Sequence, residues 1–204
     1  IIETEAQNIS AYIPTNLISI TDGQIYLSPT LFRKGNLPPI DIGKSVSRVG
    51  GKTQFAAYRS VAGDLRLTYS QFEELEAFSR FGTRLDEDTR KTLDRGRRVR
   101  AILKQPQYEP LSAARQIIVL LAVNEGIFDQ VPEDELMEAE TRVRDALQQD
   151  DAVARKIEAG EKLSDEDQAK LRDLAQEAVA AMTGEEEPGP GNGESTQNRE
   201  EKDR

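Results

Sequence analysis

The chain contains no cysteine, no histidine and no tryptophan among its 204 residues. Without cysteine, neither a disulfide framework nor a thiolate nucleophile can form, which favours a reducing compartment. Without either cysteine or histidine, zinc sites built from those residues and a Ser/His/Asp triad are excluded. The most apolar stretch, Ile117 to Val123, is far shorter than the roughly 20 residues that span a bilayer. This composition predicts a soluble protein with a modest core.

The net charge of −10 is distributed unevenly along the chain. Residues 1–111 carry 16 basic and 13 acidic side chains, whereas residues 112–204 carry 11 basic and 24 acidic ones. An acidic surface repels nucleic-acid phosphates, so we expect no nucleic-acid partner despite the basic run Arg95–Arg100.

The hydrophobic periodicity changes once and divides the chain. Over residues 1–61, short β-rich runs broken by proline and glycine predict strands, turns and short helices, typical of part of an α/β domain. Over residues 62–183, helical spacing predicts a bundle. Its first helix runs from about Leu67, with one face formed by Tyr69, Phe72, Leu75, Phe78 and Phe81, and ends at Gly82. Further helices are expected over residues 86–104, 111–124, 133–149 and 164–182, the last N-capped by Ser164. The polar residues 184–204 predict a disordered acidic tail.

Arg48 lies in a turn of small residues, Ser45–Gly50, with no catalytic apparatus around it. Taken alone, such an arginine is a surface charge or part of a structural salt bridge. A guanidinium also gives paired donors to a phosphate, and an arginine supplied in trans stabilises charge on a transferring phosphoryl group.

The adjacent Gly50-Gly51-Lys52-Thr53 is similar to the end of a P-loop. A P-loop needs a further glycine five positions before the second one, and Val46 stands there. A self-contained nucleotide hydrolase is therefore rejected, and the chain alone is expected to be inactive.

Two other segments carry candidate ligand contacts. Residues 19–23 alternate polar and apolar side chains and then reach Asp22-Gly23, which predicts a buried strand with Ser19 near its end, where open α/β sheets bind ligands. Gln105 and Gln107 flank Pro106; they indicate a solvated turn, although amides can also read an adenine edge.

Taken in order and spacing, three segments resemble the alpha-subunit family of rotary F-type ATP synthases: residues 18–25, 45–50 and 103–108. Residues 10–16, 59–63 and 81–86 look like the same family. The resemblance implies that residues 1–61 are the last part of a P-loop-type nucleotide-binding domain and residues 62–183 the C-terminal helical domain. It also implies that the β-barrel and the P-loop of the family lie upstream.

The resemblance implies roles for four residues. Arg48 matches the arginine finger that reaches the γ-phosphate in the adjacent beta subunit, and Ser19 matches a residue near that interface. Gln105 and Gln107 match positions around the adenine of the regulatory nucleotide of the alpha subunit. The cofactor implied is ATP or ADP with Mg²⁺, whose ligands lie outside this sequence.

The partners implied are beta and gamma subunits in an alpha3-beta3 hexamer, peripheral to an ion-translocating membrane sector on the cytoplasmic face of a bacterial inner membrane. Two departures suggest a divergent bacterial branch, whose coupling ion, H⁺ or Na⁺, stays open. Leu37 stands where the family usually has arginine, and Gly51-Lys52-Thr53-Gln54 where it has Ser-Ala-Ala-Gln. The alternative function is a free-standing helical module that binds anions through Arg95–Arg100.

Overall fold

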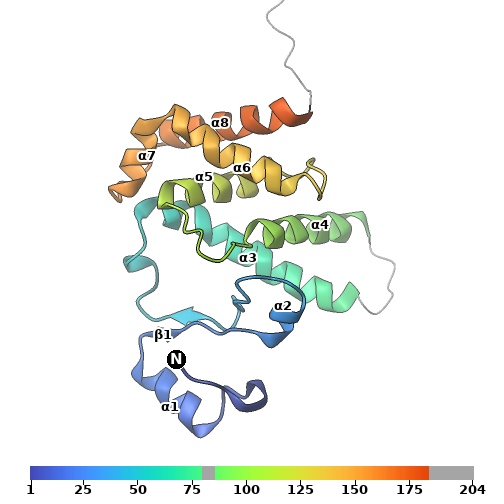
Figure 1. The fold of residues 1–204 in the computed structure, drawn as a ribbon, viewed down its shortest axis with the longest axis vertical. Coiled ribbons are helices and arrows are strands. Elements are labelled where there is room, and N and C mark those ends of the chain that lie inside the picture. Colours follow the sequence, from blue (N-terminus) through green and yellow to red (C-terminus); the bar gives the residue numbers. More distant parts are fainter. Residues whose placement is uncertain (80–85, 184–204) are drawn as a thin grey trace, which may run out of the picture.

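The computed structural model describes residues 1–79 and 86–183 (Figure 1). In this part of the chain the helices are α1 (Tyr12–Ile20), α2 (Pro29–Arg33), α3 (Ala56–Ser79), α4 (Glu87–Ile102), α5 (Ala113–Asn124), α6 (Leu136–Ala146), α7 (Asp151–Glu158) and α8 (Asp165–Thr183). Strands β1 (Gly23–Gln24) and β2 (Val46–Ser47) pair antiparallel. Short 3₁₀ turns cover Glu5–Gln7, Gly50–Lys52 and Leu147–Gln149.

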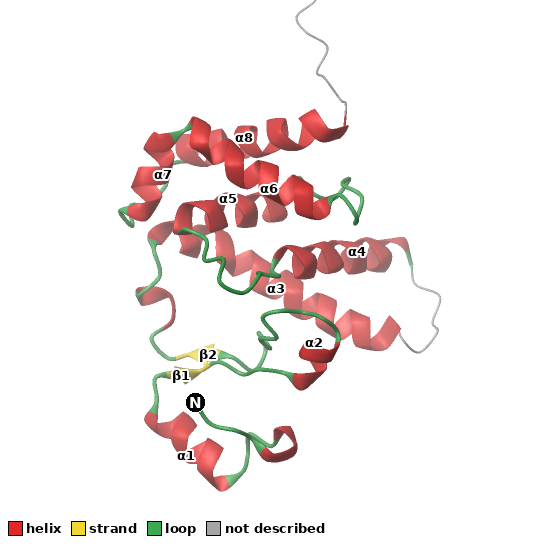
Figure 2. Ribbon diagram, in the orientation of Figure 1, coloured by secondary structure: helices red, strands yellow, loops and turns green. Residues whose placement is uncertain are grey.

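Helix α5 is the centre of the helical part, because it packs against α3, α6, α7 and α8. Figure 2 shows it between α3 and α4 on one side and α6 to α8 on the other. Its sequence is apolar on nearly every side, which is typical of a helix enclosed by others. The buried residues of α5 are Ala114, Ile117, Ile118, Val119, Leu121, Ala122 and Val123.

Capping side chains fix where several helices begin. The Asp86 carboxylate accepts the Thr89 N–H at 2.7 Å at the start of α4, and Ser112 caps α5 in the same way. Ser164 and Asp167 form a reciprocal capping box at α8, in which each side chain accepts the other residue's backbone N–H at 3.1 Å. The expected N-cap role of Ser164 is therefore confirmed.

The expected helices over residues 86–104, 111–124, 133–149 and 164–182 are confirmed, with ends shifted by a few residues. Helix α3 begins at Ala56, before the expected Leu67, and its buried face ends early, since Phe78 is 69% exposed. Helix α7 was not predicted. The sequence features that mark this helix are few: an Asp150 N-cap and two apolar residues, Val153 and Ile157, which are one turn apart and buried. Phe81, Gly82 and the predicted tail lie outside the described residues.

The prediction of a buried strand at residues 19–23 is wrong. Ser19 lies in helix α1, and the chain leaves the helix at Thr21, whose N–H and hydroxyl both reach the Leu17 carbonyl. Alternation over only five residues is a weak strand signal, and Ser19 and Ile20 are exposed, so burial does not favour the strand. Gly23 then enters β1 with φ of 146°, a conformation suited to glycine, and a Cβ there would also meet the Val46 carbonyl oxygen.

Residues 1–55 therefore form a thin segment with a two-residue antiparallel pair instead of the strands of an open α/β sheet. Its buried residues are Pro14, Tyr26 and Ser28, whereas Tyr12 and Ile20 are 84% and 70% exposed. The extended core lies in the helical part, from Ala57 onward.

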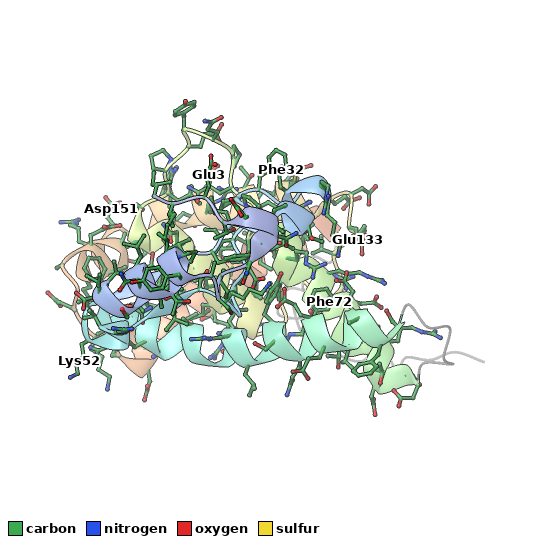
Figure 3. The ribbon with its side chains drawn as sticks, turned by 90° about the horizontal axis from the view of Figure 1, so that it is seen from below. Glu3, Phe32, Lys52, Phe72, Glu133 and Asp151 are labelled. Atoms are coloured by element: carbon green, nitrogen blue, oxygen red, sulfur yellow. The ribbon has the colours of Figure 1, made fainter. Side chains whose placement is uncertain are left out.

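Helices α3 and α4 approach closely at Gly96. A Cβ on this glycine would lie 2.0 Å from Cγ of Phe72, whose side chain is fully buried. Figure 3 labels Phe72 in this crossing. Because a real side chain cannot occupy that space, the crossing distance depends on glycine at this position.

We expect Gly96→Ala to destabilise the helical part by about 2–3 kcal/mol, because the added methyl group overpacks the Phe72 contact. Chemical denaturation followed by circular dichroism measures this change. Gly63→Ala in α3 is the matched control: its Cβ meets open space, so it should be neutral or stabilise by up to about 1 kcal/mol. Equal stability of the two variants would contradict this account of the crossing.

The α8 capping box predicts an acid-sensitive contribution to stability. The Lys156 ammonium donates to the Asp167 carboxylate at 2.8 Å and, with Ser164, lowers the pKa of Asp167 to about 2. A lowered pKa means that the stabilisation is complete above the ordinary aspartate pKa and is lost as the pH falls toward 2. We therefore expect the melting temperatures of the wild type and Asp167→Asn to differ at pH 7, with the difference shrinking below about pH 4 and disappearing only at about pH 2 and below. If the difference in melting temperature stayed constant between pH 7 and 2, the charge of Asp167 would contribute nothing to stability.

Candidate functional site

Arg48 is anchored to the C-terminal end of α1. Its Nη1 and Nη2 donate to the backbone carbonyls of Ser19 at 3.1 Å and Ile18 at 2.8 Å, and its backbone N–H donates to the Asp22 carbonyl at 2.8 Å. Carbonyls in the last turn of a helix lack intrahelical partners and carry partial negative charge, so they attract a guanidinium. The side chain remains exposed, and these bonds use two of its five N–H donors.

The structure thus brings two predicted site residues together, although not through the Ser19 hydroxyl. That hydroxyl donates to the Asn16 carbonyl at 2.6 Å within α1, and only the main-chain oxygen of Ser19 contacts Arg48. Sequence reasoning missed this arrangement because it placed Ser19 in a strand.

The rejected P-loop segment forms a single 3₁₀ turn over Gly50–Lys52, directly after β2 and Arg48. Gly50 has φ of 60°, a conformation suited to glycine. Figure 3 shows Lys52 at the opposite end of the N-terminal segment from Phe32.

A cavity of about 1230 Å³ lies between the N-terminal segment and the helical part. One wall consists of α2 and the loop after it, including Phe32, Leu37, Pro38 and Pro39. The other walls come from α4, the loop at residues 103–111 and α6. Both predicted adenine-contacting residues, Gln105 and Gln107, line this cavity together with Leu37.

The loop that carries the two glutamines is held by its own contacts. Gln105 Nε2 donates to the Glu109 carbonyl at 2.8 Å, and the Gln105 backbone N–H donates to the Leu37 carbonyl at 2.9 Å. Tyr108 adopts φ of 66°, which turns the chain back at that point. The Gln105 amide therefore has its oxygen left as an acceptor, while its nitrogen already serves the loop.

The α6 wall of the cavity carries a pair of charged groups that the sequence did not single out. Glu140 is only 7% exposed and lies 3.4 Å from the Arg144 guanidinium. Burial raises the pKa of Glu140, and Arg144 partly opposes that effect. The spacing of glutamate and arginine one helical turn apart was the available signal, but such pairs are usually solvated.

The basic run Arg95–Arg100 is largely used inside the molecule. Arg95 donates to the Val123 and Asn124 carbonyls at the end of α5, Arg98 donates to Val131, and Arg97 pairs with Asp94. Arg100 makes two bonds to the Glu76 carboxylate at 2.8 and 3.0 Å. These contacts are structural, and they do not support the alternative of a free-standing anion-binding module.

Residues 1–79 and 86–183 contain neither a candidate metal site nor a candidate membrane span. No three acidic, histidine or cysteine side chains in that part gather as a metal-binding group. No helix there has the length and apolar character that crossing a membrane requires.

Comparison with known families places both parts of the chain. Residues 54–178 match the ATP synthase alpha/beta chain, C terminal domain, and residues 1–47 match the ATP synthase alpha/beta family, nucleotide-binding domain. The boundary between the two matches falls just before α3.

Several curated relatives are similar over most of this chain. The ATP synthase subunit alpha 2 of Syntrophotalea carbinolica is 68% identical over 167 residues, which are 82% of this chain and 32% of the relative. The ATP synthase subunit alpha 1 of Rhodopirellula baltica is 62% identical over 182 residues, 89% of this chain and 36% of the relative. The ATP synthase subunit alpha 2 of Syntrophus aciditrophicus is 64% identical, also over 182 residues, which are 89% of this chain and 35% of the relative.

The chain spans about a third of the length of these curated relatives. The resemblance seen in the sequence is confirmed over both matched regions, and the helical fold of residues 56–183 agrees with it. Because one family match alone covers more than half of its residues, the chain belongs to the ATP synthase alpha/beta family.

Proposed function

We propose that this chain is the C-terminal part of an alpha subunit in a rotary ATP synthase, and that Arg48 acts in trans at a catalytic site of the adjacent beta subunit. The observation that supports this most strongly is the geometry of Arg48: it is exposed, held at two points by the α1 carbonyls, and retains further donors. A guanidinium fixed in this way presents its free N–H groups to a phosphate without losing much side-chain entropy.

The proposed mechanism assigns a limited task to this chain. Arg48 stabilises the negative charge that develops on the transferring phosphoryl group, while the beta subunit supplies the P-loop and the groups that hold Mg²⁺. Ser19 contributes its carbonyl, which orients the guanidinium. The complete complex contains beta and gamma subunits and lies peripheral to the membrane sector, on the cytoplasmic face in this proposal.

A second element of the proposal is a regulatory nucleotide in the cavity. Gln105, Gln107 and the apolar wall of Phe32, Leu37 and Pro38 offer amide groups and flat apolar surface, which suit a purine base. The nucleotide there is structural or regulatory in this proposal, as the family resemblance implies. The domain limits that go with this proposal are 1–61 for the end of the nucleotide-binding domain and 62–183 for the helical domain.

We expect Arg48→Ala, in the complete alpha subunit assembled with beta and gamma, to lower steady-state ATP hydrolysis by about 10³-fold or more, since the in-trans charge is lost. Ser19→Ala should stay within about twofold of the wild type, because its carbonyl is retained. The assay is ATP turnover of purified complexes whose subunit composition is checked by gel filtration. Near-normal turnover of an intact Arg48→Ala complex would exclude the proposed role.

Leu37→Arg tests the regulatory site. We expect it to tighten nucleotide retention at the cavity by about three- to tenfold, because a guanidinium is added to the wall that Leu37 occupies. Retention is measured as the release rate of radiolabelled ADP from the purified subunit. Leu37→Met keeps the size without the charge and should leave the rate unchanged. If all three proteins release ADP equally fast, the base does not bind beside Leu37.

A further inference from the structure

Among the described residues, two polar contacts join the segment around α2 to the helical part. In the described part of the chain, Lys34 Nζ at the end of α2 lies 3.5 Å from Oε2 of Glu76 in α3. The Leu37 carbonyl accepts the Gln105 backbone N–H at 2.9 Å. Both contacts connect the loop after α2 with the helical part, and Leu37 and Gln105 themselves line the cavity.

We infer that these two contacts form a clasp that sets the width of the cavity, with Lys34 as a positioning residue for the ligand bound there. The part of this inference that concerns ligand affinity rests on the proposed nucleotide in the cavity. The part that concerns the clasp itself does not.

Glu76 is a fixed anchor for the clasp. Its carboxylate receives two bonds from Arg100, whose Nε also donates to the Tyr69 hydroxyl at 3.2 Å. The Arg100 guanidinium lies 4.4 Å above the ring centre of Phe72. The bonds from Arg100 hold the pKa of Glu76 below its ordinary value, against the opposing effect of burial. Glu76 therefore stays ionised and oriented whether or not Lys34 is bound.

The N-terminal segment also acts on a second acidic side chain of α3, Glu73. Burial raises the pKa of Glu73 on α3, and the negative charge of Asp41, in the N-terminal segment, raises it further. Lys34 and Glu76 are 35% and 26% exposed, so salt screens their attraction only in part.

The alternative is that Lys34 makes an ordinary surface ion pair, which changes nothing beyond itself. The two possibilities differ in what happens at residues 34–39 and 103–107 when the charge is removed. A clasp loosens both segments together, whereas an ordinary pair leaves the Gln105 N–H protected by Leu37.

The test compares Lys34→Gln with Arg33→Gln in the complete alpha subunit. Arg33→Gln removes the same charge one residue away, from a side chain that makes no ion pair with Glu76 in the described structure. Hydrogen exchange of residues 34–39 and 103–107 is measured without nucleotide, and the Kd for Mg-ADP is measured by equilibrium dialysis.

For Lys34→Gln we expect faster exchange in both segments and a Kd about two- to fivefold weaker than that of the wild type, with the difference shrinking in about 0.5 M salt. For Arg33→Gln we expect neither change. If the two variants show the same exchange, the clasp is excluded. If exchange is faster in Lys34→Gln but the Kd is unchanged, Lys34 is not a positioning residue. If the wild type binds no nucleotide, the proposed regulatory site fails, and the exchange experiment still decides on the clasp.

Discussion

The close crossing of α3 and α4 at Gly96 and Phe72 is the constraint on which the helical side of the cavity depends. With no side chain at Gly96, the Phe72 ring lies directly against α4. The same ring supports the Arg100 guanidinium, which lies above it and binds Glu76. Glu76 in turn faces Lys34 of the N-terminal segment. One packing contact therefore determines where the helical part presents charge to the segment that closes the cavity.

The two parts of the chain are stabilised by different means. The helical part has an enclosed central helix and a continuous core that runs from Ala57 to Val179. The segment of residues 1–55 has almost no core of its own and is shaped by backbone and side-chain hydrogen bonds such as those of Arg48. Hydrogen bonds specify geometry well but contribute modestly to stability, since they replace bonds to water. The position of the N-terminal segment consequently depends on its contacts with other surfaces, and the contact between Lys34 and Glu76 is one of them.

The sequence was sufficient to predict those features that arise from local periodicity. Four helices of the bundle followed from apolar spacing and from caps such as Ser164, and the family followed from three ordered motifs. The prediction of a strand at residues 19–23 was wrong. Alternation over five residues is too short a signal to establish a strand where the side chains are exposed. The pairing of Glu76 with Arg100 and Lys34 could not be predicted, since it depends on how α3 crosses α4. That crossing depends in turn on the absence of a side chain at Gly96. From the sequence alone, a glycine within a helix indicates only low helix propensity.

The manner in which Arg48 is held bears on why this position suits arginine and not lysine. A lysine ammonium has three N–H donors and could also reach these carbonyls, but it is a point charge on a flexible stem, which leaves its direction undetermined. The planar guanidinium binds the Ile18 and Ser19 carbonyls along one edge, which fixes the plane of the whole group. The remaining N–H donors then point away in a direction set by helix α1. In the proposed role, in which Arg48 meets phosphate oxygens of another subunit, this orientation adds to the effect of the charge, which water would screen until the subunits close around it.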